Sequence, residues 1–389
     1  MSYTISQLKT DLTGMLHGTS LDKIQGIDDL ISRAGRQVLS DIDPAETIRK
    51  GQIVNALYDD VYEYMAPTDL KGNRIIDIVP QNSRTVADNF SQTFQENFDL
   101  YKSITNNVFT VQNNNGVKTI RISKNLTSGI LISDVNGIAT NGTWTVGNDA
   151  TNLTEDNVYH ITGSKSLRFD LDGGGTDGCL ENSTLTPIDL SNDQELTAIF
   201  VNVYIPDSTA FTSLDLRFGS SVSNYWNRTV TTTQSTTSPI TGWNLFRFDW
   251  DGATETGTVD ETAINYIRVT VNYDGTPQNG YRLDNIVSRK PFVFNWLYYS
   301  TSIFSTTGGV FQDTVTDDSN TVNLGIDSYN ILLEKCAEYC FGQSQNSDAS
   351  REQTKYENKY LTGITRYKAK YKSEVEKPKQ PYYKMRIGR

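Results

Sequence analysis

Few side chains in this sequence have the types and spacing that covalent catalysis requires. There are two histidines, His17 and His160, and neither lies in a recognisable motif beside a nucleophile, so a Ser-His-Asp triad is not indicated. Nothing singles out one carboxylate pair for glycoside hydrolysis. The run Gly173–Gly175 lacks the phosphate-loop pattern and predicts a turn. We therefore expect that the chain is not an enzyme.

The three cysteines, Cys179, Cys336 and Cys340, form no CxxC pair. An odd count without such a pair predicts no disulfide framework. Cys336 and Cys340 are four residues apart on an expected helix and are interpreted as small buried hydrophobic side chains. A zinc site would need more ligands than these residues offer. No cofactor is expected from this set.

Aromatic side chains are better candidates for binding. Tyr225 and Trp226 lie amid polar residues, where exposed rings can stack on a sugar. Trp243 and Trp250 fall in alternating strand patterns and are expected to lie in the core.

A stripe of aromatic residues follows the C-terminal helical pattern at spacings of three and four: Tyr356, Tyr360, Ile364, Tyr367 and Tyr371. Such a stripe suits an interface with another protein, or packing on the chain's own core, and the sequence leaves both open. After Pro378 and Pro381 the chain ends in a short basic and aromatic segment that is expected to become ordered on docking. Its candidate docking residues are Tyr382, Tyr383, Lys384, Met385, Arg386, Ile387 and Arg389.

The charge is unevenly distributed. The chain has 389 residues and a net charge of −11, yet residues 351–389 carry +8, which leaves −19 for the rest. A basic tail on an acidic body favours docking on an acidic partner or nucleic acid, or is a solvated polar terminus. The sequence shows no signal peptide and no apolar run long enough to span a bilayer, so no membrane partner is expected.

Helical patterns occupy both ends of the chain. Ser20 is a candidate cap for a helix through Leu21, Ile24, Ile27, Ile31, Ala34 and Val38. A second helix start is expected at residues 43–46. Near the other end, helices are expected from Ser328 to Cys340 and from about Asp348 to Glu374.

The middle of the chain has strand patterns. Strands are expected at residues 53–64 and 74–79, and a hairpin turns at Asn113–Gly116. From residue 134 to 290 short strands recur between turn signals: 142–146, 166–171, 196–205, 213–218, 243–250, 266–273 and 281–287. Such spacing predicts a β-sandwich or jelly roll.

The predicted fold class is thus α+β multidomain. A mainly helical domain with a small β element, residues 1–133 and 291–375, would be interrupted by an inserted all-β sandwich at 134–290, with an extended basic tail at 376–389. Insertion at a surface loop costs the host domain little.

Two strands of the sandwich resemble carbohydrate-binding modules. Gly163-Ser164-Lys165-Ser166-Leu167-Arg168-Phe169 is similar to their opening strand, and Tyr281-Arg282-Leu283-Asp284-Asn285-Ile286 to their closing strand. The resemblance implies sugar binding, and it implies that Asp284 helps to hold a structural calcium.

The outer segments resemble the head–tail adaptors of tailed bacteriophages. The resemblance rests on Tyr58–Tyr64 leading through Pro67-Thr68-Asp69-Leu70 to Ile75–Ile78, on residues 332–339 with the helix after them, and on the basic tail. It implies a homo-oligomeric, dodecameric ring that docks to the portal protein through the tail residues. It also implies a downstream neck or tail protein as a neighbour and transient contact with packaged DNA.

The sequence therefore favours a structural virion protein in the neck between capsid and tail, assembled in the host cytoplasm, with an outward-facing sandwich. The alternative is a carbohydrate-binding tail or surface protein that contacts host glycans. A third possibility, a glycoside hydrolase with a binding module, is disfavoured because the helical segments are too small for the usual catalytic barrel.

Overall fold

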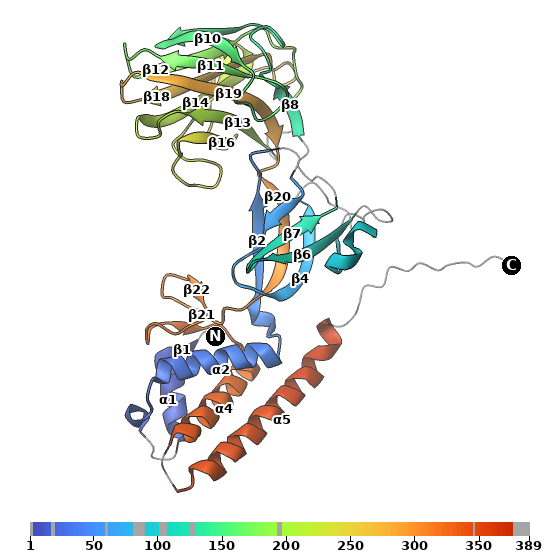
Figure 1. Cartoon of the computed structure of the whole chain (residues 1–389), viewed down its shortest axis with the longest axis vertical. Coiled ribbons are helices and arrows are strands. Elements are labelled where there is room, and N and C mark those ends of the chain that lie inside the picture. The colour runs from blue at the N-terminus through green and yellow to red at the C-terminus, as the bar shows by residue number, and fades with distance from the viewer. Residues whose placement is uncertain are drawn as a thin grey trace, which may run out of the picture. The chain divides into compact units, whose positions relative to one another are not determined.

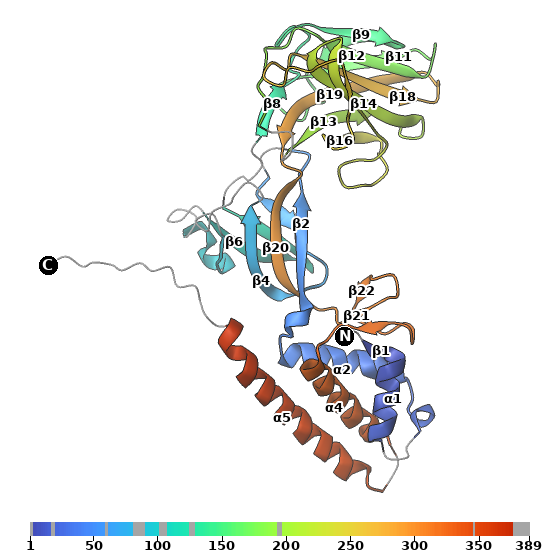
Figure 2. The same cartoon turned by 180° about the vertical axis from the view of Figure 1, so that it is seen from behind.

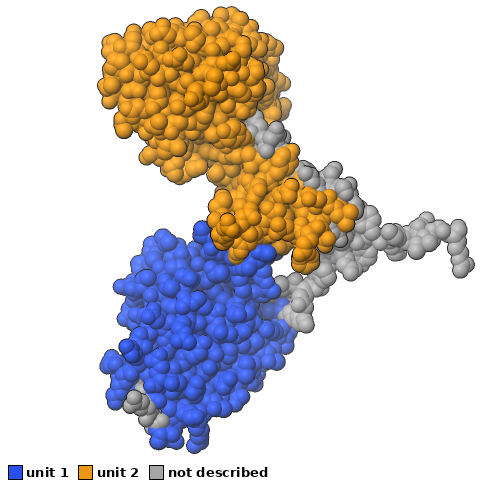
Figure 3. Space-filling model, viewed as in Figure 1, with its two compact units in different colours: residues 1–50, 67–76, 297–389 blue, residues 51–66, 77–296 orange. Residues whose placement is uncertain are grey.

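The computed structural model describes residues 3–16, 20–58, 61–80, 90–100, 107–123, 129–192, 197–344 and 347–375. Strands make up 42% of the structure and helices 23%. The chain divides into two compact units (Figure 3). Unit 1 contains residues 1–50, 67–76 and 297–389, and unit 2 contains residues 51–66 and 77–296.

Unit 1 is built around helices from both ends of the chain (Figure 1). These are α1 (Ile5–Met15), α2 (Ile27–Asp41), α4 (Ile326–Gln343) and α5 (Ala349–Val375). A small sheet has the order β1–β23–β21–β22, formed by Tyr3–Thr4, Thr321–Val322, Phe304–Ser305 and Phe311–Gln312. One apolar core joins the two ends, because Leu8, Ile31 and Val38 share it with Leu332 and Cys336. Burial of such side chains is the main force that holds the helices together.

Local sequence signals set where the unit 1 helices begin. The Thr4 hydroxyl accepts a bond from the Gln7 amide (3.1 Å) and caps α1. The predicted cap Ser20 starts only a short 3₁₀ helix, Leu21–Lys23, and α2 begins after Gly26. Within α2, Gly35 permits close approach, because a β-carbon there would lie 2.7 Å from the Ile303 side chain.

The expected helix start at residues 43–46 produces one 3₁₀ turn, Ala45–Thr47, followed directly by strand β2 (Ile48–Val54). This strand belongs to a three-stranded sheet of order β2–β20–β4, with β20 at Phe292–Ser300 and β4 at Leu70–Pro80. A second sheet has the order β3–β7–β6–β5, formed by Glu63–Met65, Val117–Ile122, Val108–Asn114 and Ser91–Gln92. A 3₁₀ helix covers Gln95–Asn97.

The predicted fold class is wrong, because the described part of the chain is mostly β and forms five sheets. The outer segments are not mainly helical with one small β element. The helical periodicity of the chain ends does not extend into Phe292–Ser300, whose aromatic and β-branched residues favour a strand. The hairpin prediction is confirmed: β6 pairs with β7, and Asn115 and Gly116 both have positive φ.

The predicted β-sandwich is confirmed in unit 2 (Figures 1 and 2). One sheet, called the β19 sheet below, has the order β10–β11–β19–β13–β16, and β8 also pairs with β19. Its strands are Gly129–Ser133 (β8), Ala150–Asp156 (β10), Ser166–Leu171 (β11), Ala198–Ile205 (β13), Gly242–Asp249 (β16) and Gln278–Arg289 (β19).

The opposite sheet, called the β18 sheet, has the order β17–β15–β14–β18–β12–β9. Its strands are Trp144–Asn148 (β9), Asp177–Asn182 (β12), Phe211–Ser221 (β14), Asn224–Val230 (β15), Thr254–Thr256 (β17) and Tyr266–Tyr273 (β18). Alternate residues of both sheets form one buried core, which includes Leu214, Leu216 and Phe218 as the alternation predicts.

None of the described helices combines the length and the apolar character that a bilayer crossing requires.

Candidate functional site

A row of large side chains crosses the outward face of the β19 sheet. In the strand register, Arg168 of β11 lies opposite Arg282 of β19, Arg282 opposite Tyr204 of β13, and Tyr204 opposite Trp243 of β16. Side chains that are paired across antiparallel strands share a face and lie close enough to interact. The register therefore assembles two guanidinium groups and two aromatic rings from four strands.

The alternation of each strand turns this row away from the sandwich core. Leu167 and Phe169 are in the core, as are Val203 and Ile205, and Tyr281 and Leu283. Neighbouring residues on a strand point to opposite faces of the sheet. Arg168, Tyr204 and Arg282, which each lie between the two members of one of these pairs, therefore point outward.

A fifth side chain reaches the same place from the loop between β10 and β11. Tyr159 is 50% exposed, and its ring centroid lies 5.9 Å from that of Tyr204. The Tyr204 ring meets the Trp243 ring edge to face at 5.7 Å. The Arg282 guanidinium lies 4.5 Å from the Tyr159 ring centroid and 4.7 Å from that of Tyr204. These five residues, Tyr159, Tyr204, Trp243, Arg168 and Arg282, are called the Tyr204 platform.

Asp156 holds Arg282 in position. Its carboxylate accepts a bond from Arg282 Nε at 2.7 Å, and its other oxygen accepts from the amides of Val158 (2.8 Å) and Tyr159 (3.2 Å). Burial favours a higher pKa for Asp156, but these hydrogen bonds outweigh it and keep the pKa below its usual value. Asp156 is thus an anion that fixes both the arginine and the start of the Tyr159 loop.

Asp284 anchors the other end of this loop. It is fully buried, and its Oδ2 accepts from the amides of Ile161 (2.5 Å) and Thr162 (3.1 Å) while Oδ1 accepts from the Thr162 hydroxyl (3.3 Å). Ser166 also donates to the Tyr159 carbonyl at 2.6 Å. Burial raises the pKa of Asp284 to about 6, although the hydrogen bonds favour its charged form.

The calcium that the sequence resemblance implied for Asp284 does not fit this environment. Both carboxylate oxygens face hydrogen-bond donors, whereas calcium needs six to eight oxygen ligands. Within the described ranges, no group of three or more His, Cys, Asp or Glu side chains could hold a metal ion. Asp284 instead serves as an acceptor that fixes the loop.

The two residues predicted to stack on a sugar, Tyr225 and Trp226, lie on the β18 sheet. Because they are neighbours on one strand, their side chains point to opposite faces of that sheet. Trp226 packs against Phe218 and Trp250 beside the core. Tyr225 lies under the Arg217 guanidinium, which is 5.0 Å from its ring centroid. The two rings therefore do not form one platform.

Trp243, expected in the core, lies instead on the Tyr204 platform. The sequence did contain this signal, since Trp243 has the same parity as Arg247 and the opposite parity to the core residues Phe246 and Phe248.

The aromatic stripe on α5 packs on the chain's own core. Tyr356, Tyr360, Ile364 and Tyr367 are buried in unit 1, and Tyr371 packs against the same core. The docking residues predicted in the tail, 382–389, and His17 lie outside the described residues.

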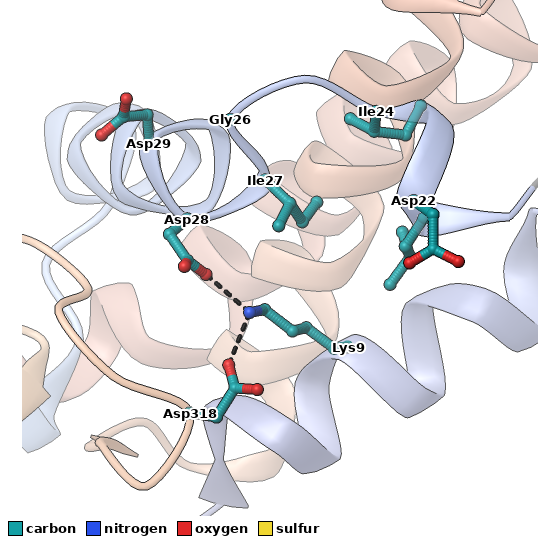
Figure 4. Close-up of a pocket in the computed structure, with 9 residues that line it drawn as sticks. Lys9, Asp22, Ile24, Gly26, Ile27, Asp28, Asp29 and Asp318 are labelled. Carbon is teal, nitrogen blue, oxygen red and sulfur yellow. Dashed lines mark hydrogen bonds and ion pairs between the residues drawn. The ribbon is translucent and has the colours of Figure 1, made fainter.

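Unit 1 has a hollow of about 640 Å³ beside α1 and α2 (Figure 4). Lys9 lies in it between Asp28 (2.8 Å) and Asp318 (2.5 Å). Burial acts to lower the pKa of Lys9, but its two hydrogen-bonded carboxylates raise it above the usual value. The lysine therefore stays charged and joins α1 to α2 and to residue 318, which is a structural role.

No family model matches the chain, and no curated protein matches it. Among solved structures, the chain is similar to the family 11 carbohydrate-binding module of the cellulosomal cellulase Lic26A-Cel5E of Clostridium thermocellum. That match has 16% identity and a TM-score of 0.29, and it covers 42% of this chain and 95% of the other.

A family 11 carbohydrate-binding module from Clostridium thermocellum in complex with a β-1,3-1,4-mixed-linked tetrasaccharide matches at 17% identity and a TM-score of 0.30, over 42% and 98% of the two chains. A family 30 carbohydrate-binding module matches at 11% identity and a TM-score of 0.32, over 42% and 99%. None of these three structures is a head–tail adaptor.

Proposed function

We propose that the β-sandwich binds carbohydrate at the Tyr204 platform, without catalysis. The observation that carries this proposal is the set of three neighbouring rings, Tyr159, Tyr204 and Trp243, beside two guanidinium groups on one sheet face. A sugar ring has an apolar C–H face and polar hydroxyl edges. Aromatic rings with hydrogen-bond donors at their margin complement both parts.

Replacing Tyr204 with alanine should weaken glycan binding by about tenfold or more, because it removes the central ring of the platform. The affinity of the full chain would be measured on a glycan panel and then by calorimetry. The matched control is Tyr225→Ala, which removes a ring of the same size from the opposite sheet.

Retained tryptophan fluorescence and circular dichroism would establish that both variants fold. If Tyr225→Ala abolishes binding while Tyr204→Ala does not, the glycan binds on the β18 sheet and not at the Tyr204 platform. If the intact chain binds no glycan, the proposal fails.

We further propose that unit 1 is the part that joins a larger assembly, a ring subunit in a virion neck that docks to a portal through residues 382–389. Support comes from the sequence resemblance to adaptors and from the core that both chain ends share. Unit 2 is thus inserted between segments of unit 1, as residues 51–66 and 77–296.

Mass measurement of purified particles should find the chain in the virion at one copy per ring position. A chain that lacks residues 377–389 should fold normally and fail to join the particle. Absence of the intact chain from particles, or normal incorporation of the shortened one, would contradict this second proposal.

A further inference from the structure

We propose that the sugar is anionic, and that Arg168 and Arg282 bind its carboxylate or sulfate group while the neighbouring rings bind its apolar face. This inference rests on the proposed carbohydrate binding and names the ligand class of the same site. It comes from the way in which the two guanidinium groups are held.

The two arginines converge over Gly280. Arg282 Nη1 and Arg168 Nε lie 3.6 and 3.7 Å from the point where a β-carbon of residue 280 would stand. Gly280 has φ +91°, a conformation that side chains rarely adopt. The glycine therefore leaves the space between the two like charges open, and an anion there would relieve their repulsion.

Arg282 is fixed before any ligand arrives. Its Nε donates to Asp156 and its Nη1 to the Gly280 carbonyl, both at 2.7 Å, and the centroids of the Tyr159 and Tyr204 rings lie 4.5 and 4.7 Å from the guanidinium carbon. The structure gives Nη2 no partner among the described residues. A fixed guanidinium loses little entropy on binding, so its remaining donor is a good one for an oxyanion.

Arg168 is more accessible to a ligand than Arg282 is. Its side chain is 42% exposed, and its one partner in the described part of the chain is Asp170, which its Nη2 reaches at 3.4 Å. Nε and Nη1 have no partner among the described residues. They lie on different edges of the guanidinium, so each can donate a hydrogen bond to an oxygen of a carboxylate or sulfate.

The nearby carboxylates are directed inward. Asp170 accepts from the Gly280 amide (2.7 Å) and from Asn152 (3.1 Å), and Asp156 accepts from the loop amides. Each of these side chains is 12% exposed, as is that of Arg282, whereas the Arg168 side chain is 42% exposed. A ligand at the surface therefore meets Arg168 before it meets either acid.

The whole chain has a net charge of −11, which opposes long-range attraction of an anion. Selectivity for an anionic sugar must then come from short-range contacts. Added salt would screen both effects, so variants and matched ligands test the inference better than a salt series.

The test uses the full chain and calorimetry with two matched ligand pairs: a galacturonate oligosaccharide against its methyl ester, and a sulfated galactan oligosaccharide against its desulfated form. In at least one pair the charged member should bind about tenfold more tightly, and the pair that does so identifies carboxylate or sulfate as the group. Arg168→Gln should remove this preference. Arg217→Gln, on the β18 sheet, should leave it unchanged.

If charged and neutral members bind equally while Tyr204→Ala still abolishes binding, the anionic ligand is excluded and carbohydrate binding stands. If the chain binds neither these ligands nor any member of a wider panel of neutral and anionic polysaccharides, both proposals fail.

Discussion

Replacing Tyr360 with alanine should lower the free energy of unfolding of unit 1 by about 3–5 kcal/mol, the usual loss for a large buried aromatic side chain. The ring is 2% exposed in the shared core, and Lys335 Nζ lies 4.6 Å from its centroid. Its hydroxyl donates to Asp41 at 2.6 Å and so joins α5 to α2. Burial raises the pKa of Tyr360, so the hydroxyl keeps its proton and remains a donor.

Two spectroscopic signals separate the units. All five tryptophans lie within the residue ranges of unit 2, whereas the helices α1, α2, α4 and α5 lie in unit 1. Far-UV circular dichroism should therefore follow unit 1 in a denaturant titration, and tryptophan fluorescence should follow unit 2. Only the helical transition should shift in Tyr360→Ala.

Two variants serve as controls for this prediction. Leu361→Ala changes the next residue on α5, which is 53% exposed, and should cost about 0.5 kcal/mol or less. Tyr360→Phe removes only the hydroxyl and should cost about 1 kcal/mol. If Tyr360→Ala leaves the helical transition in place but prevents assembly with a partner, the stripe on α5 is an interface and not a core element.

The periodic elements of this chain could be predicted from sequence because their signals are local. Ser166–Leu171 and Tyr266–Tyr273 form strands with the bounds that the alternation predicted. Ala349–Val375 is close to the expected helix. Where two local signals competed, prediction failed: residues 43–46 look like a helix start, yet β-branched and aromatic partners turn the next residues into β2.

The Tyr204 platform could not be predicted as a site, because its geometry depends on register between distant strands. Tyr204 and Arg282 lie opposite each other only because β13 pairs with β19, and nothing in the sequence sets that pairing. The alternation of residues along β16 would by itself have placed Trp243 on the outward face, opposite the core residues Phe246 and Phe248. The position of Tyr159 depends on two carboxylates, the partly buried Asp156 and the buried Asp284, whose roles appear only in three dimensions.

Replacing Asp284 with alanine should destabilise unit 2 by about 2–5 kcal/mol, because the Ile161 and Thr162 amides would lose their buried acceptor. The loop that carries Tyr159 would also lose its anchor, so glycan affinity should fall with stability. The loss should appear in the tryptophan fluorescence transition. The helical transition of unit 1 should not move.

Asp260 provides a matched control. It accepts from the amide and the hydroxyl of Thr262, at 3.1 and 2.7 Å, but it is exposed. Water can replace these bonds, so Asp260→Ala should cost about 1 kcal/mol or less. If the two variants lose equal free energy of unfolding, burial of Asp284 does not increase the cost of removing its hydrogen bonds.

The same carboxyl should make the stability of unit 2 depend on pH in an unusual direction. Its pKa is about 6 in the folded chain, above the value of 3.8 for an unburied aspartate. Between these values the folded state binds more protons than the unfolded state, so this group's contribution to stability falls as pH rises. Two pKa units correspond to about 3 kcal/mol.

Denaturant titrations of the native chain and of Asp284→Asn, at several values from about pH 4 to about pH 7, isolate this effect from that of other carboxyls. The amide does not titrate, so the stability of the native chain relative to the variant should decline across this range. A relative stability that rises with pH would mean that the N–H donors of Ile161 and Thr162 stabilise the carboxylate by more than burial disfavours it. In that case the pKa of Asp284 in the folded chain would lie below that of an unburied aspartate, and Asp284 would act on the Tyr204 platform in the same charge state as Asp156.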